Sequence, residues 1–195
     1  MGNPESEIWL IRHGETEWSL SGAHTSATDI PLTERGRKRA EAIHTYLRER
    51  KFSLVLTSPR LRAMETCRIS GFAAGAHVDD NLSEWDYGEY EGRTTAEIRK
   101  AVPDWSVWES NPAGGETLQQ VAERAQKVID RSKAAGGRVA LFSHAHILRV
   151  LAAIWIGMPP KAGSLLALGT GTVSTLGFER ETRVIRTWNR SFELE

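Results

Sequence analysis

The order of short apolar runs and helical patterns most constrains the fold of this chain. Strands are expected at residues 8–11, 52–57 and 138–143, where apolar residues follow one another without the spacing of a helix. Helical patterns follow each of them, and the first begins at Thr33, with Ala40, Ile43 and Leu47 on one face. Alternation of this kind is typical of an α/β fold with a mostly parallel sheet.

The remaining elements are expected from caps and breakers. Ser58 and Pro59 match an N-cap and first residue of a helix that ends near Gly71. Thr117 and Gln120 match a capping box, and that helix stops at residues 136–137. An apolar helix is expected at 144–156, and strands near 172–178 and 183–188 suggest a hairpin at the sheet edge. Residues 80–115 predict only one short helix, at 94–101.

Charge and composition exclude several classes of protein. The 195 residues carry 25 basic and 25 acidic side chains, so no basic excess points to nucleic acid or a membrane surface as a partner. No apolar run is long enough to span a membrane, and the polar start of the chain does not resemble a secretory signal. A lone cysteine, Cys67, excludes an internal disulfide and is expected in the core. We expect a single cytoplasmic domain over residues 1–195.

Polar residues follow three of the expected strands. Arg12 and His13 come after the first, residues 58–62 after the second, and His144 after the third. Parallel strands would bring these groups to one edge, where ligands of open α/β sheets bind. Helices starting near Pro59 and His144 would point their N-termini there, and Arg62 would lean back toward the same place. Cations, imidazoles and helix N-termini together suit a phosphate group.

Each group has a plainer interpretation when it stands alone. An Arg-His-Gly sequence is usually a turn, His144 could be a cap, and Arg62 could be a solvated helix residue. Only their convergence favours a site. Residues 84–91 hold four carboxylates among three aromatic side chains, which indicates either a solvated loop or a desolvated carboxyl group with a raised pKa. The residues alone do not choose one carboxylate among the four.

The same segments match a family pattern. Residues 10–18, which include Arg12-His13-Gly14, resemble the signature of the histidine phosphatase superfamily, the phosphoglycerate-mutase-like proteins. The resemblance extends over further motifs, at residues 28–36, 57–66, 82–92, 114–117 and 143–146. It implies a three-layer α/β/α sandwich with a mixed, mostly parallel central sheet.

The resemblance also implies roles for individual residues. His13 corresponds to the nucleophile that becomes phosphorylated, Glu84 to the proton donor, and Arg12, Arg62 and His144 to the rest of the phosphate pocket. Positioned cations stabilise the charge on a transferring phosphoryl group. An imidazole can attack phosphorus when its other nitrogen is held, and a backbone carbonyl is the expected holder. An alkoxide leaving group, whose conjugate acid has a pKa of about 15.7, needs a general acid.

Further substrate contacts are implied at Ser19, Thr25, Ala145 and His146, in addition to Arg12, Arg62 and Glu84. No cofactor and no metal are implied. The pair His144-x-His146 suggests a metal-dependent phosphoesterase as an alternative, but residues two apart on a helix face different directions. His146 is therefore expected to line the pocket or cap the helix.

Departures from the mutase pattern favour hydrolysis. Only residues 93–113 lie between the acidic motif and the Gly-Gly-Glu motif, and Ser19 and Trp85 stand where mutases have Asn and Arg. We expect a phosphatase for small phosphate monoesters, sugar phosphates first, acting through a phosphohistidine. A cofactor-dependent phosphoglycerate mutase is the alternative, and a non-catalytic sensor of phosphate ligands is a third interpretation.

Two features leave alternatives open. Trp105 and Trp108 could cover the pocket mouth or form a small hydrophobic cluster under a loop. The apolar helix at 144–156 could fill the core or form the contact of a homodimer.

Overall fold

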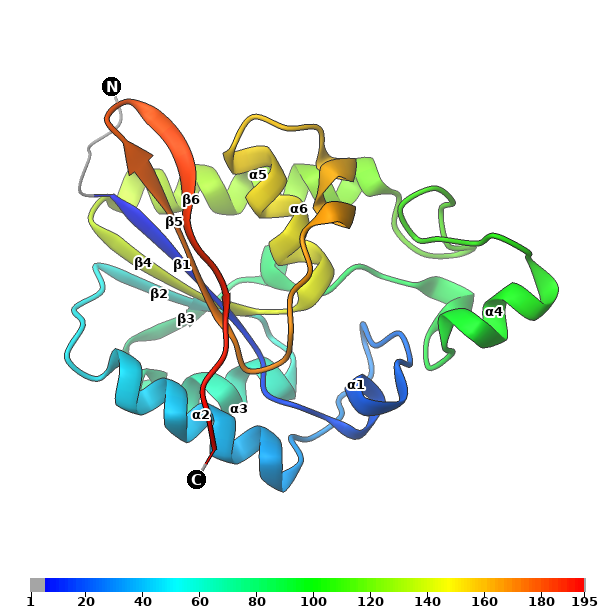
Figure 1. Ribbon diagram of the computed structural model, residues 1–195, viewed down its shortest axis with the longest axis horizontal. Coiled ribbons are helices and arrows are strands. Elements are labelled where there is room, and N and C mark those ends of the chain that lie inside the picture. The colour runs from blue at the N-terminus through cyan, green and yellow to red at the C-terminus, as the bar shows by residue number, and fades with distance from the viewer. Residues whose placement is uncertain (1–5, 195) are drawn as a thin grey trace.

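A central sheet of six strands organises the molecule (Figure 1). The computed structural model describes residues 6–194, so most of the polar N-terminal segment and Glu195 lie outside the described residues. The strands are β1 (Glu7–Arg12), β2 (Leu54–Thr57), β3 (Ala76–Val78), β4 (Arg138–Ser143), β5 (Val173–Glu179) and β6 (Thr182–Arg190), in the spatial order β3-β2-β4-β1-β5-β6. Strands β1 to β4 run parallel, and β5 and β6 form an antiparallel edge hairpin. The mixed, mostly parallel sheet and its edge hairpin are therefore confirmed.

Helices cover both faces of this sheet. The helices are α1 (Glu17–Ser21), α2 (Glu34–Leu47), α3 (Leu61–Ile69), α4 (Thr95–Ala101), α5 (Leu118–Ala135) and α6 (Ala145–Trp155). Helices α2 and α3 lie on one face and α5 and α6 on the other, while α1 and α4 extend beyond one end of the sheet (Figure 1). Single-turn or short 3₁₀ helices occur at Ala73–Gly75, Asp80–Leu82, Gly88–Tyr90 and Pro160–Leu165. The three-layer α/β/α arrangement is confirmed.

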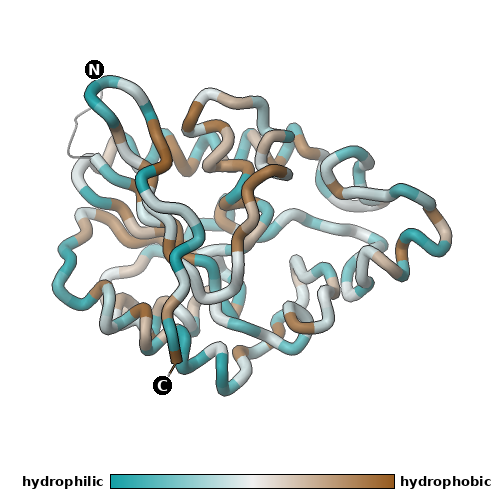
Figure 2. The backbone as a smooth tube through the Cα atoms, in the orientation of Figure 1, coloured by the Kyte–Doolittle hydropathy of each residue, from teal (hydrophilic) through white to brown (hydrophobic). Residues whose placement is uncertain are grey.

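The core is divided by the sheet into two hydrophobic clusters. The larger lies under α5 and α6, and the smaller lies under α2 and α3, where Cys67 is buried as expected. The apolar face of α6 is buried in the larger cluster, so its apolar residues are used within the chain. Figure 2 shows the apolar residues concentrated in the central strands and polar residues along the outer loops. Burial on both faces explains why the central strands are continuous apolar runs.

The register of the central strands brings their carboxyl ends together. Arg12 is paired with Ser143, so His13 and His144 follow at neighbouring positions of β1 and β4. Backbone hydrogen bonds continue beyond the strands, since the N–H of His13 donates to Ser143 O at 2.9 Å and the N–H of Ser58 to Phe142 O at 2.9 Å. The convergence of the three polar groups at one sheet edge is confirmed.

The start of α3 differs from the prediction. The helix begins at Leu61, its N-cap is Arg60, and no side chain caps it. The Leu61 N–H donates instead to Asp29 Oδ1, at 2.9 Å, from a segment distant in sequence. Ser58 lies two residues before the N-cap, and its hydroxyl accepts from the Arg60 N–H at 3.3 Å and is bonded to His144 Nε2 at 2.7 Å. A tertiary carboxylate has replaced the local cap that the Ser-Pro pattern predicts.

Strand β3, helix α1 and the 3₁₀ helices were not predicted. Strand β3 has only three residues and the helix α1 only five, both too short to show a periodic pattern. Helix α1 is fixed by a capping box between Thr16 and Ser19. Among the described residues, no helix combines the length and the apolar character needed to cross a bilayer.

Candidate active site

A small cavity opens at the carboxyl ends of β1 and β4. Its volume is about 160 Å³. The lining comes from the segment after β1, from the acidic segment and from the first turn of α6: Arg12, His13, Thr16, Ser19, Gly22, Ala23, His24, Thr25, Glu84, Tyr87, Ala145 and His146. Seven of the nine residues expected at the site therefore line one cavity, namely Arg12, His13, Ser19, Thr25, Glu84, Ala145 and His146.

His13 is a buried, neutral imidazole with a defined tautomer. Its Nδ1–H donates to Gly14 O at 2.7 Å, so the lone pair is on Nε2. Burial holds the pKa of His13 well below its usual value, and the charges of Arg62 and Arg12 lower it further. The expected backbone carbonyl partner is present. Gly14 itself is required here, because a Cβ would collide with the backbone of Gly36 in the first turn of α2.

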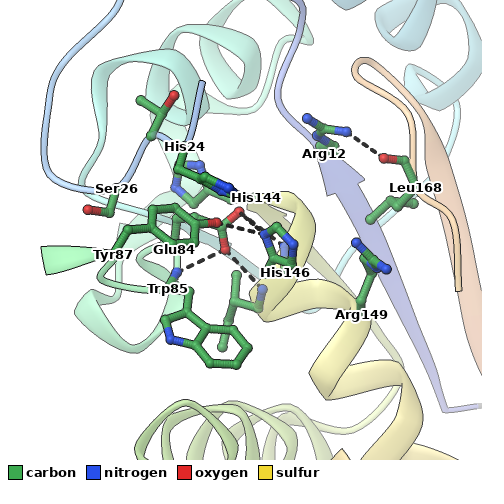
Figure 3. Close-up of polar contacts among 12 residues, drawn as sticks. Arg12, His24, Ser26, Glu84, Trp85, Tyr87, His144, His146, Arg149 and Leu168 are labelled. Carbon is green, nitrogen blue, oxygen red and sulfur yellow. Dashed lines mark hydrogen bonds and ion pairs between the residues drawn. The ribbon is translucent and has the colours of Figure 1, made fainter. Parts of the chain in front are cut away.

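Arg12 places a cation in the cavity wall. One Nη1–H donates to Leu168 O, whereas the buried Nε has no hydrogen-bond partner among residues 6–194 (Figure 3). Burial lowers the pKa of Arg12 to about 10, so its guanidinium remains charged at neutral pH. A buried N–H without a partner calls for an acceptor, and an anionic oxygen is the strongest one available.

Arg62 and His144 lie behind the cavity wall and are fully buried. Arg62 Nε donates to His144 Nδ1 at 3.1 Å, so the proton of the neutral His144 is on Nε2 and donates to Ser58 Oγ at 2.7 Å. The ring centroids of His13 and His144 are 5.2 Å apart. Burial lowers the pKa of His144 well below its usual value. Both were expected in the phosphate pocket, but here His144 uses both ring nitrogens within the protein.

Arg62 also holds the loop that carries Thr25. Its Nη1 donates to Thr28 O, and its Nη2 to Thr25 O and Ser26 O, at 3.0–3.2 Å. Glu91 also holds this loop, since its carboxylate accepts hydrogen bonds from the N–H groups of Ser26 and Thr28. Four of the five Arg62 N–H groups are thus used, and one on Nη1 has no partner among the described residues.

Glu84 is an ionised carboxylate held at the N-terminus of α6 (Figure 3). Its oxygens accept from the N–H groups of His146 and Ile147, both at 3.0 Å, and from its own neighbour Trp85 at 2.9 Å. Burial raises the pKa of Glu84, but the hydrogen bonds and charge of His146 outweigh it, so the pKa is well below its usual value.

One interpretation of the acidic segment and one expectation about the helix are therefore wrong. Residues 84–91 indicated either a solvated loop or a desolvated carboxyl group with a raised pKa; burial does raise the pKa of Glu84, but the side-chain hydrogen bond and the charge of His146 lower it further than burial raises it. The N-terminus of α6 was expected to face a bound anion directly. Its His146 and Ile147 amides instead hold Glu84. Glu84 thus has the place that the pattern assigned to a phosphate oxygen.

Three lining residues matter that the sequence did not single out. His24 packs against Tyr87, with ring centroids 4.7 Å apart, and burial lowers its pKa to about 4. The Tyr87 hydroxyl shares a 2.7 Å hydrogen bond with His146 Nδ1, and Thr16 caps α1 beside the cavity. His146 lines the pocket, as expected. The aromatic residues among the carboxylates of segment 84–91 were the available signal for Tyr87, whereas nothing local indicates His24.

The two tryptophans occupy neither expected position. Trp105 is buried in the larger core cluster and Trp108 packs against that cluster. They still contact the site from behind, since Trp105 lies 5.2 Å from His24 and Trp108 5.3 Å from His146, measured between ring centroids. Ser19 Oγ, expected to touch substrate, donates to Thr16 O at 2.8 Å and serves the cap of α1.

Another hollow within residues 6–194 differs from this cavity in its lining. A larger open groove of about 880 Å³ lies between α2 and residues 190–194, and its lining includes neither histidine nor cysteine. Within residues 6–194, no three His, Cys, Asp or Glu side chains form a group that could hold a metal ion. The small cavity is therefore the candidate active site.

Comparison with known proteins places the chain in one family. The chain is 38% identical to an acid phosphatase of Mycobacterium tuberculosis, over 94% of this chain and 92% of that protein. It is 35% identical to sedoheptulose 1,7-bisphosphatase of Saccharomyces cerevisiae, over 76% of this chain and 67% of that protein. The solved structure of an open reading frame from Mycobacterium tuberculosis superimposes with a TM-score of 0.89 at 35% identity, over 95% and 97% of the two chains. The family model of the histidine phosphatase superfamily (branch 1) matches residues 8–191, and this chain belongs to that family.

Proposed function

We propose that this histidine phosphatase hydrolyses small phosphate monoesters, with sugar phosphates as its first substrate class, through a phosphohistidine at His13. The observation that carries the proposal is the state of His13. Its Nδ1–H is fixed on Gly14 O and its pKa is lowered, so Nε2 is an unprotonated nucleophile on a ring that lines a cavity beside Arg12.

The first step transfers the phosphoryl group. His13 Nε2 attacks phosphorus, the bond between phosphorus and the ester oxygen breaks, and the leaving alkoxide takes a proton. The unpartnered Nε of Arg12 is the donor that fits a phosphoryl oxygen in the cavity, and the charge of Arg62 acts on the phosphoryl group from behind the cavity wall. His144 supports this arrangement by holding Arg62 Nε. In the second step water attacks phosphorus and inorganic phosphate leaves His13.

Glu84 is the proposed proton carrier for both steps. It is ionised without substrate, which suits a base that activates water in the second step. A phosphate monoester has a second pKa of about 6, so its monoanion can bring a proton into the site. The charge of the bound phosphate raises the pKa of Glu84 and allows the carboxyl group to hold that proton until the leaving oxygen takes it.

Cavity size and lining support the substrate class. A cavity of about 160 Å³ holds a phosphoryl group and a few further atoms, less than typical ligand sites of about 300–1,000 Å³. Hydroxyl and imidazole groups of Thr16, His24, Thr25 and Tyr87 line it, and such groups suit the hydroxyls of a sugar. The relative named sedoheptulose 1,7-bisphosphatase adds support for a sugar phosphate.

A panel of phosphate esters tests the proposal. Sugar monophosphates and bisphosphates, phosphoglycerates and p-nitrophenyl phosphate would be compared by kcat/KM for phosphate release. We expect sugar phosphates to rank first, and labelled substrate to leave a base-stable, acid-labile phosphoprotein. Phosphoglycerate interconversion faster than phosphate release would indicate a mutase, and binding without any turnover would indicate a sensor.

A further inference from the structure

Arg124 lies outside the cavity, on α5, and three of its hydrogen bonds go to the segment that carries Glu84. Nη1 donates to Asn81 O at 2.8 Å and to Ser83 O at 2.9 Å, and Nη2 donates to Glu84 O at 3.3 Å. The other two bonds, from Nε and Nη2, form a bidentate pair with Glu116, both at 2.7 Å. A guanidinium has five N–H groups, so none is left for a substrate.

Glu116 holds the backbone on the other side of Glu84, and we call Arg124 and Glu116 together the frame. Its Oε2 accepts from the N–H of Asp86 at 3.0 Å, and its own N–H donates to Asp86 O at 2.9 Å. Its carbonyl accepts from Trp85 Nε1 at 2.8 Å. Arg124 thus fixes the backbone before and at Glu84, and Glu116 fixes the two residues after it.

The backbone around Glu84 lies outside the helices and strands. The 3₁₀ helix Asp80–Leu82 ends two residues before Glu84, and the next element begins at Gly88. Partly buried carbonyls in such a segment need other partners, and Arg124 donates to three of them from one rigid, planar group. A lysine ammonium carries its donors at one point and cannot reproduce this fork.

We propose that Arg124, oriented by Glu116, is a positioning residue that sets the reach of the Glu84 carboxylate toward the leaving oxygen of the substrate. The inference rests on the proposed role of Glu84 in proton transfer. It predicts a selective defect: variants of the frame slow the transfer of alkyl phosphates, which need a proton on the leaving oxygen, and largely spare nitrophenyl phosphate, which does not.

The test is Arg124→Lys, assayed by kcat/KM with a sugar phosphate and with p-nitrophenyl phosphate. We expect a loss of about tenfold or more for the sugar phosphate, since misplacement of a catalytic group by about 1 Å costs up to about 10²-fold. The loss for nitrophenyl phosphate is expected to stay below about threefold. Equal losses for the two esters would overturn the proposal, because a general structural defect has no reason to sense the leaving group.

Arg131→Lys is the matched control. Arg131 lies seven residues later on the same helix and donates to Asp79 Oδ2 at 2.8 Å, so it grips the chain just before the segment that Arg124 holds. The chemical change is identical and the carbonyls of residues 81–84 are untouched. We expect both esters to be turned over as in the wild type. A selective loss in Arg131→Lys equal to that in Arg124→Lys would contradict the assignment to Arg124.

Glu116→Gln provides a second variant that keeps the proposal falsifiable if Arg124→Lys folds poorly, as judged by its melting temperature. It is expected to show the same selective loss, and the double variant to lose little more than either single variant, because both remove one frame. Independent, multiplicative losses would overturn the coupling of the two residues.

Glu84→Gln, measured alongside, separates the two proposals. Selective loss in Glu84→Gln without selective loss in Arg124→Lys or Glu116→Gln overturns only the positioning role. No selectivity in Glu84→Gln overturns the role of Glu84, and the positioning proposal falls with it.

Discussion

The two halves of the candidate site are held by different kinds of contact. His13 and His144 follow neighbouring parallel strands, and backbone hydrogen bonds of the sheet run on past the strand ends to fix His13. Glu84 lies in a segment between two 3₁₀ turns. The Arg124 side chain of α5 holds its carbonyl, and backbone N–H groups in the first turn of α6 hold its carboxylate.

The difference separates two tasks. The strand-end half is buried and cationic, and its pKa shifts come first from desolvation, which keeps His13 and His144 neutral. The Glu84 half has a shift that hydrogen bonds reverse in sign. We infer that changes in the strand-end half affect every phosphate ester alike, whereas changes in the Glu84 half depend on the leaving group.

His13→Ala is expected to have the largest effect. Loss of a covalent nucleophile should lower kcat by on the order of 10⁶-fold for every ester, with no labelled phosphoprotein after an alkaline quench. Phosphate release with p-nitrophenyl phosphate is the simplest measurement. Substantial activity in this variant would exclude the strand-end half as the source of the nucleophile.

Arg62→Lys is expected to have the second largest effect. The lysine removes the fork that reaches His144 and the carbonyls of Thr25, Ser26 and Thr28, so we expect about 10²–10³-fold lower kcat/KM. The loss should be the same for alkyl and nitrophenyl esters, because the charge and the loop that Arg62 holds act on the phosphoryl group and not on the leaving oxygen. A loss confined to alkyl esters would break the division between the halves.

Glu84→Gln should show the opposite pattern. We expect about 10²-fold lower kcat/KM for a sugar phosphate and less than about tenfold for nitrophenyl phosphate, since only the alkoxide needs a proton. Using kcat/KM confines the comparison to the steps through transfer to His13. Equal losses would remove the proton-donor role.

The pH dependence sharpens the same contrast. Because the pKa of Glu84 is lowered, the free enzyme carries the carboxylate across pH 5–8, and the proton must arrive with the substrate monoanion. For alkyl esters kcat/KM should therefore fall about tenfold per pH unit above the substrate pKa of about 6. The fall should be shallower for nitrophenyl phosphate. Parallel profiles would argue against proton delivery by the substrate.

The smallest effect concerns stability. Burial lowers the pKa of His24 to about 4, so between pH 6.5 and 4 the unfolded state binds the extra proton and the folded state loses stability as pH falls. The slope should be somewhat below about 1.4 kcal/mol per pH unit, because His24 is only partly buried. His24→Asn should lower the total slope in denaturant unfolding by this amount, with the part due to His13 and His144 remaining, and exposed His77→Asn is the control. An unchanged slope would contradict the buried neutral state.

Prediction from sequence succeeded where local pattern and strand topology agree. The apolar runs of β1 and β4 predict two buried strands, and their parallel register alone brings His13 beside His144. It failed where a distant group replaced a local one. Asp29 caps α3 in place of Ser58, and the α6 amides that were expected to face a phosphate hold Glu84. Neither contact could be predicted from the spacing of residues, because its two partners lie far apart in the sequence.

The chain's own sequence determined the order of strands and helices, the edge where polar groups gather, and the residue types that suit phosphate chemistry. These follow from periodicity and chirality, which act over a few residues at a time. Only the tertiary structure decided the protonation and hydrogen-bond partners of the site. The lowered pKa of Glu84 and the hydrogen bonds of Arg124 depend on burial and on groups tens of residues apart in the sequence.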